Sequence, residues 1–262
     1  MKLKWKFFIV LLLASLVPLA IVSLISFNTS KTLGESIAAH TTHALSETVQ
    51  REIVFATENY AMITGRSKLS AELALHLLIS EAEKTLAAPL PRTGPVYYAE
   101  DFDNPASAPE DLAPSKYHMM IREDGKLVPK KISKKHPNVF IPSSVDRSSI
   151  YDDITRFAGL SPVLKGIAGE FGHTLFWIYA SLESGVHISY PGHGGYPQGY
   201  DPRQRPWYTQ AQNIKDGHVR WGEPIADATT SQLTFTVSGT ISQPDGSFAG
   251  VAAIDVLIPK VL

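Results

Sequence analysis

The feature that most restricts the fold of this chain is an uncharged apolar segment close to the N-terminus. Residues 7–27 (FFIVLLLASLVPLAIVSLISF) contain no charged side chain, and a helix of about 20 apolar residues crosses a bilayer. Three lysines precede the segment within residues 1–6, and the next basic residue is Lys31. The positive-inside rule therefore predicts a cytoplasmic tail at 1–6, a transmembrane helix at 7–27 and export of the rest. A cleaved signal peptide is the alternative, but the apolar segment is longer than a usual signal core and no A-x-A site follows.

The chain that follows the apolar segment has the composition of a long stalk helix. Residues 28–88 contain no proline and are rich in alanine, leucine, glutamate and threonine. Apolar residues recur there at spacings of four and three, which predicts either packing on a domain or a homodimer seam between two stalk helices. The stripe comprises Leu45, Val49, Ile53, Ala56, Tyr60 and Ile63. Prolines in residues 89–115 end the helix and predict a loop.

Short strands and turns dominate the remainder, residues 116–262. Alternating apolar patterns around glycine-containing turns predict three hairpins, over residues 117–128, 174–190 and 233–258. Residues 150–171 have a helical pattern that glycine and proline interrupt. Sequential hairpins with helices confined to a few segments predict an α+β fold, in which helices flank an antiparallel sheet.

Composition excludes several classes of protein. The chain has 24 lysines and arginines against 25 aspartates and glutamates, a balance that argues against a nucleic-acid partner. Because it has no cysteine, disulfides, thiolate metal sites and cysteine nucleophiles are excluded. The short motifs of P-loop proteins, α/β-hydrolases and zinc proteases are absent from the sequence. His40 and His43 share a helix face without a third ligand in register, so neither a metal nor a cofactor is predicted.

Aromatic residues and arginines are concentrated in residues 190–208 (YPGHGGYPQGYDPRQRPWY). The glycines and prolines exclude regular structure there, and loops on a rigid scaffold often carry binding groups. Arg205 supplies a planar fork suited to a carboxylate, and Tyr200 and Trp207 supply rings with polar edges. The alternative is that Arg203 and Arg205 pair with acidic neighbours and hold the loop, which is the preferred interpretation for Arg203.

Several segments in this half resemble the membrane-distal module of double-Cache extracellular sensor domains. They are YDPRQRPWY, the run WGEP followed by Asp227, and GSFAGVAAIDV, which contains Asp255. The resemblance is strong over residues 173–256 and loose over 28–172. It implies a PAS-like fold with a transmembrane helix, a stalk helix, a ligand-binding distal module, a smaller proximal module and a second transmembrane helix. Residues 116–262 would form the distal module, and we expect the chain to be a fragment or a truncated product that stops before the proximal module.

The resemblance also implies a ligand site. Amino-acid-binding members of the family have a Tyr, then Arg and Trp five and seven residues later, then a Tyr and an Asp two apart, and a final Asp that ends the last strand. The ligand-binding residues expected on this basis are Tyr200, Arg205, Trp207, Tyr208, Asp227 and Asp255. Ile225 stands where the second Tyr is expected, which removes one polar contact to an ammonium group. A fork for a carboxylate and two acids for an ammonium suit a zwitterion. The structural alternatives are that Asp227 caps a turn and that Asp255 ends a strand.

The sequence therefore predicts the sensor portion of a signal-transduction receptor of the chemotaxis or two-component type. It would lie outside the cytoplasm on a single span of the inner membrane and bind an amino acid or an amine. The resemblance implies a kinase, phosphatase, cyclase or chemoreceptor output, and no enzyme activity is predicted for this chain itself. One rival is an anchored periplasmic hydrolase that uses Asp227, Asp255 and His193. The other is a structural dimer with an unused pocket.

Overall fold

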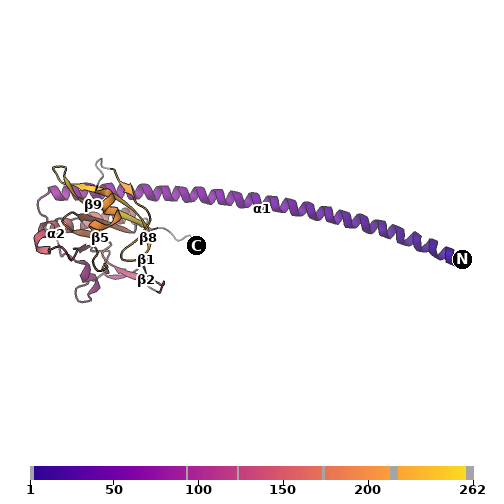
Figure 1. The fold of residues 1–262 in the computed structure, drawn as a ribbon, viewed down its shortest axis with the longest axis horizontal. Coiled ribbons are helices and arrows are strands. Elements are labelled where there is room, and N and C mark those ends of the chain that lie inside the picture. The colour runs from indigo at the N-terminus through magenta and orange to yellow at the C-terminus, as the bar shows by residue number, and fades with distance from the viewer. Residues whose placement is uncertain (1–2, 93, 123, 173–174, 213–217, 258–262) are drawn as a thin grey trace. The chain divides into compact units, whose positions relative to one another are not determined.

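The computed structural model describes residues 3–92, 94–122, 124–172, 175–212 and 218–257. Within the first helix, the description leaves out the side chains at 3, 4, 6, 7, 10, 13, 15, 38, 39 and 42–64. The chain divides into two units, residues 1–64 and residues 65–262. Helix α1 (Leu3–Ala87) begins in the first unit and ends in the second (Figure 1).

Helix α1 provides all the described residues of the first unit. Within the part of the chain that the structure describes, the apolar window long enough to cross a membrane is Leu16–Ile37, which overlaps the predicted segment 7–27 and begins later. Its apolar side chains are exposed, as lipid-facing groups would be: Leu19 is 67% and Val22 63% exposed. The predicted stripe from Leu45 to Ile63 lies outside the described side chains, so the homodimer seam stays a prediction.

The second unit is built on an antiparallel sheet (Figure 1). The strand order is β3 (Asn138–Phe140), β5 (His187–Tyr190), β4 (Trp177–Leu182), β9 (Phe248–Leu257), β8 (Leu233–Ser242) and β6 (Arg220–Trp221), and β7 (Ile225–Ala226) also pairs with β8. The pairing of β4 with β5 and of β8 with β9 confirms two predicted hairpins. At the tip of the second, Gly246 has a φ of +83°, which explains the glycine there.

The third predicted hairpin forms a separate sheet of two strands, β1 (Ala113–Ile121) and β2 (Leu127–Ile132). Strand β1 begins inside the segment predicted as a loop, 89–115, which also contains the 3₁₀ helix η1 (Ala99–Asp103). The prediction of a continuous loop is therefore wrong at these two places. Proline disfavours a helix interior, but it is compatible with an edge strand and with the flanks of a short turn of helix.

Helices bury one face of the main sheet. The end of α1, α2 (Tyr151–Ala158) and α3 (Ser161–Phe171) share a core with the strands, and α2 and α3 account for the predicted helical segment 150–171. The core includes the fully buried Leu75, Leu78, Phe157 and Leu164. Three shorter helices complete the unit: η2 (Arg147–Ile150), η3 (Pro202–Gln204) and α4 (Pro206–Ala211).

The two-residue period of the strands decides which side chains reach the opposite face. On β4, Ile178 belongs to the helical core, whereas Trp177 and Tyr179 belong to a second cluster with Trp207 of α4. The same alternation places His187 of β5 and Asp255 of β9 beside them. Buried polar groups are therefore gathered on one face of the sheet.

Candidate functional site

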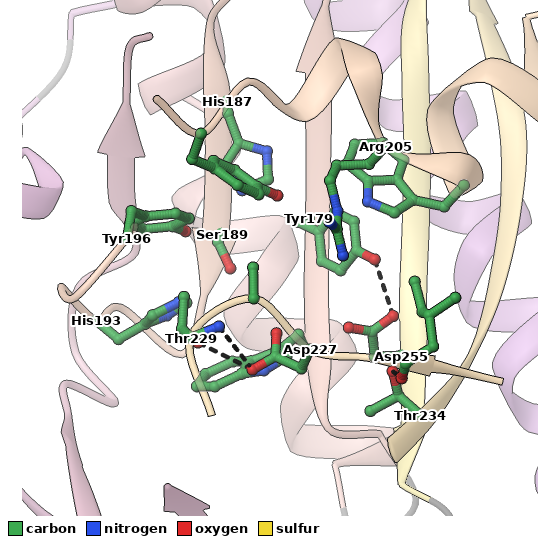
Figure 2. A pocket seen from close by; sticks show the side chains of 15 residues that line it. Tyr179, His187, Ser189, His193, Tyr196, Arg205, Asp227, Thr229, Thr234 and Asp255 are labelled. Carbon is green, nitrogen blue, oxygen red and sulfur yellow. Dashed lines mark hydrogen bonds between the residues drawn. The ribbon is translucent and has the colours of Figure 1, made fainter. Parts of the chain in front are cut away.

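A small cavity lies on the sheet face opposite the helical core (Figure 2). Strands β4, β5, β8 and β9 contribute part of its wall, and the rest comes from the loop after β5, helix α4, strand β7 and the turn after β7. Five of the six predicted ligand-binding residues line this cavity: Tyr200, Arg205, Trp207, Asp227 and Asp255. The sixth, Tyr208, is not among the lining residues and packs edge-on against Phe248. Ile225 lines the cavity where the family pattern has a Tyr.

Asp255 is deeply buried in the cavity wall, with 4% of its surface exposed. Its Oδ1 accepts hydrogen bonds from the hydroxyl of Tyr179 at 2.8 Å and from that of Thr236 at 2.6 Å. Burial, and then the charge of Asp227, raise the pKa of Asp255 to about 7. Strand β9 continues past this residue to Leu257, so Asp255 does not end the strand. Its carboxyl group can change charge near neutral pH and can respond to a cation in the cavity.

Asp227 both caps a turn and lines the cavity. Its Oδ2 accepts from the backbone N–H groups of Thr229 at 3.2 Å and Thr230 at 2.7 Å. The hydroxyls of the same two residues donate to this oxygen at 3.0 and 2.5 Å. The turn-capping alternative is therefore correct, and it coexists with a place in the cavity wall. Four hydrogen bonds to one oxygen fix the orientation of the carboxylate.

Arg205 lines the same cavity as the two carboxylates, and in the view of Figure 2 it lies above Asp227 and Asp255. Its Nη2 lies 3.4 Å from the carbonyl oxygen of Ala226, and its guanidinium carbon lies 6.0 Å from the ring centre of Tyr200. Both contacts are weak. Arg203 behaves differently, because it forms an ion pair with Asp201 at 2.8 Å and donates to the carbonyl oxygen of Glu183 at 3.0 Å. The interpretation that Arg203 holds the loop is confirmed.

Two histidines line the cavity that the family pattern does not include. His187 lies 2.7 Å from the hydroxyl of Ser181 through Nδ1, and burial lowers its pKa to about 3. Burial also holds the pKa of His193 well below its usual range. Both rings are therefore uncharged at neutral pH. His187 had a local signal in the sequence, since it alternates with the apolar Val186 and Ile188 and so had to face the same side as Ser189.

The residues of the rival hydrolase also meet here, because His193 lines the same cavity as Asp227 and Asp255. His193 donates from Nδ1 to the carbonyl oxygen of Pro191 at 3.0 Å, and its ring stacks on Trp177 with the centres 4.1 Å apart. In a hydrolytic triad a carboxylate orients the histidine through this nitrogen. The described residues contain no group of three or more metal-ligating side chains.

A comparison with known families favours a sensor over a hydrolase. Residues 164–261 match the model of the first PDC sensor domain of methyl-accepting chemotaxis protein-like receptors. Over these residues the chain is similar to a chemoreceptor PDC sensor domain. The match includes the whole segment, 173–256, in which the sequence resembles extracellular sensors most strongly, so that resemblance is confirmed. The antiparallel sheet with flanking helices is the fold of this sensor domain.

Curated relatives of the PDC sensor domain are whole chemotaxis receptors. The methyl-accepting chemotaxis protein McpB of Bacillus subtilis is 35% identical over 85 residues, which are 32% of this chain and 12% of McpB. The receptor TlpB of the same species is 39% identical over 85 residues, again 32% of this chain and 12% of the relative. The aligned segment thus spans about an eighth of the length of these receptors.

Solved structures give similar matches over part of the chain. The ligand-binding domain of the Pseudomonas fluorescens chemoreceptor CtaA, in complex with L-serine, is 25% identical, with 38% of this chain and 41% of that chain covered and a TM-score of 0.34. That of the Pseudomonas aeruginosa amino-acid chemoreceptor PctC, in complex with GABA, is 30% identical, with coverages of 34% and 40% and a TM-score of 0.30.

Proposed function

We propose that this chain is the extracytoplasmic sensor portion of a chemotaxis receptor and that its cavity binds a small amino acid. Arg205 receives the carboxylate, and Asp255 and Asp227 receive the ammonium. The observation that supports the proposal is that one cavity is lined by charges of both signs, supplied by Arg205 and by the two carboxylates. Charge-assisted hydrogen bonds at both ends would orient a zwitterion in one direction.

The membrane arrangement is part of the same proposal. The apolar window Leu16–Ile37 anchors the chain, and the sensor unit, residues 65–262, lies outside the cytoplasm. Signal output belongs to the cytoplasmic part of the receptor. Two such chains would associate through the stalk stripe from Leu45 to Ile63.

The cavity favours compact ligands with uncharged side chains. Its free volume is about 30 Å³, while roughly 10–15 Å³ of such volume is enough for one water molecule. An amino acid therefore enters only if the wall moves outward, and the glycine- and proline-rich loop after β5 is the part of the wall with the fewest regular hydrogen bonds. His187 and His193 are uncharged, so they offer no opposite charge to a carboxylate or an ammonium on a ligand side chain.

A thermal-unfolding panel on the full chain in detergent micelles tests the function. An amino acid that binds should raise the free energy of unfolding by about 2.7 kcal/mol at 100 times its dissociation constant. L-Alanine is compared with propionate, which lacks the ammonium, and with ethylamine, which lacks the carboxylate. We expect small neutral amino acids to stabilise the chain and the one-ended analogues to stabilise it much less. Equal stabilisation by propionate would contradict the assignment of the carboxylates.

The affinity should also depend on pH through Asp255. Because the ammonium binds the ionised carboxylate, and the pKa of the unliganded group is about 7, the ionised fraction falls as the pH drops below 7. The affinity for L-alanine should then decrease about tenfold per pH unit below that value and level off above it. Calorimetry between pH 5 and 8.5 measures this, and an affinity that is constant over the range would show that Asp255 does not meet the ammonium.

A further inference from the structure

A buried lysine lies just behind the wall of the cavity. Lys130 of strand β2 is only 8% exposed, although its neighbour Lys131 on the same strand is exposed. The alternation follows from the strand period, which turns Lys130 inward with Ile132 and Lys131 outward. Lysine is seldom buried to this extent without a charged partner, so its position calls for a reason.

The ammonium of Lys130 meets both segments that close the cavity. Nζ lies 3.5 Å from the carbonyl oxygen of Thr229, in the turn that Asp227 caps. It also lies 3.0 Å from where a Cβ would stand at Gly195, in the loop after β5. The backbone N–H of Gly195 donates to Asp103 at 2.8 Å, so this carboxylate closes the arrangement from the solvent side. Lys130 itself is not among the lining residues of the cavity.

The charges around Lys130 explain why it stays in this position. Burial lowers the pKa of its ammonium, while Asp227 and then Asp103 act in the opposite direction. Asp103 is exposed, so water screens its charge more than that of Asp227, which is half-buried. The other titratable groups nearby are the buried imidazoles of His118 and His193, which are both kept uncharged by burial. The lysine therefore places a positive charge beside the cavity, and water screens this charge only weakly because the side chain is buried.

We propose that Lys130 determines the specificity of the cavity for amino acids over amines, a role that depends on the proposed function. With the two carboxylates alone, the cavity would attract any ammonium compound. A positive charge behind Asp227 opposes every ligand ammonium equally, but it attracts only those ligands that also carry a carboxylate. The net effect favours a zwitterion over the amine that lacks the carboxylate. The β1–β2 hairpin thus contributes to ligand choice without contacting the ligand.

The test measures the ratio of the affinity for an amine to the affinity for the matched amino acid. A loss of packing alone would weaken both ligands and would not raise this ratio consistently across the pairs. Calorimetry on the full chain in micelles compares each of glycine, L-alanine and L-valine with its matched amine, methylamine, ethylamine and isobutylamine. In Lys130→Met we expect the affinity for the amine, relative to the amino acid, to increase about tenfold. Lys130→Arg keeps the charge and should restore the wild-type ratio. Lys131→Met removes an exposed lysine from the same strand and should leave the ratio unchanged.

Each result has a distinct meaning. An identical ratio in Lys130→Met and Lys131→Met would overturn the role of Lys130 while leaving the proposed function intact. If the wild-type chain binds neither member of any pair, the proposed function fails and the inference falls with it. Lys130→Gln, which keeps a hydrogen-bond donor near Thr229, is the second neutral variant. It should shift the ratio in the same direction as Lys130→Met, so a folding defect in one variant does not leave the proposal undecided.

Discussion

Replacing Asp255 with asparagine is expected to stabilise the ligand-free chain at pH 8 while it weakens the binding of amino acids. The folded-state pKa of Asp255 is about 7 and its ordinary value is 3.8. Because the pKa is raised in the folded state, the contribution of this carboxyl group to the free energy of unfolding is fully present below about pH 4. It is lost as the pH rises to 7. Above pH 7 the ionised carboxylate costs up to roughly 4 kcal/mol, about three units at 1.4 kcal/mol each. Asparagine avoids this cost because it never ionises.

The same substitution keeps the hydrogen bonds that the buried oxygen accepts. An asparagine Oδ1 can accept from Tyr179 and Thr236 as the carboxylate does, so the local packing is retained. What is lost is the negative charge for a ligand ammonium, and truncation of a buried charge pair costs about 2–5 kcal/mol of binding free energy. We expect affinity for L-alanine to fall by about two orders of magnitude. A residue that lowers stability and raises affinity is typical of a binding site.

Denaturant unfolding of the full chain in micelles, followed by tryptophan fluorescence, measures the stability change at pH 5 and pH 8. The increase should be larger at pH 8, because Asp255 is mostly protonated at pH 5. Asp245→Asn is the matched control, since Asp245 lies in the turn of the same β8–β9 hairpin and hydrogen bonds lower its pKa. That variant should lose stability instead. A uniform loss of stability in Asp255→Asn at both pH values would refute the ionisation argument.

The fold was largely accessible from sequence where its signals are local. The hairpin turns at Gly125 and Gly246 have positive φ values, so the glycines there identified the tips directly. The 3₁₀ helix η1 and the two-residue strands β6 and β7 escaped prediction because they are too short to develop a period. The stalk pattern predicted the helix correctly, but a spacing pattern alone does not say what covers an apolar stripe.

The candidate site could be predicted from the sequence only in part, because only some of its residues lie close together in the chain. Tyr200, Arg205 and Trp207 lie within eight positions of one another, and the family motif linked them to Asp227 and Asp255. His193 is in the same loop, but the sequence does not show that the ring is buried and therefore uncharged. Lys130 is 97 residues from Asp227 in the chain, and only the tertiary fold brings β2 to the cavity. Tyr208 lies outside the cavity lining because a helical turn directs adjacent residues to different sides, and Trp207 is the one that faces the cavity.

Replacing Arg205 with alanine is expected to abolish measurable binding of amino acids and to leave the stability of the chain nearly unchanged. The two contacts that Arg205 makes with Ala226 and Tyr200 are both long, so little folding energy depends on them. A ligand carboxylate, by contrast, would receive two parallel hydrogen bonds from the guanidinium, and their loss costs about 2–4 kcal/mol, or roughly 30- to 1,000-fold in affinity. Calorimetry with L-alanine measures the affinity, and thermal unfolding measures the stability.

Arg203→Ala, two residues away, is the control, because it should lower the stability of the chain more than its affinity for amino acids. Its ion pair with Asp201 and its hydrogen bond to Glu183 hold the loop, so this variant should lose about 1–2 kcal/mol of stability and should retain binding to a greater extent. Arg205→Lys separates charge from geometry, because lysine keeps the cation but not the planar fork, and we expect it to recover only part of the affinity. Ethylamine lacks the carboxylate, so its weak binding should not be reduced by Arg205→Ala. If ethylamine and L-alanine were weakened equally, Arg205 would act by shaping the cavity, and the direction proposed for the bound zwitterion would be wrong.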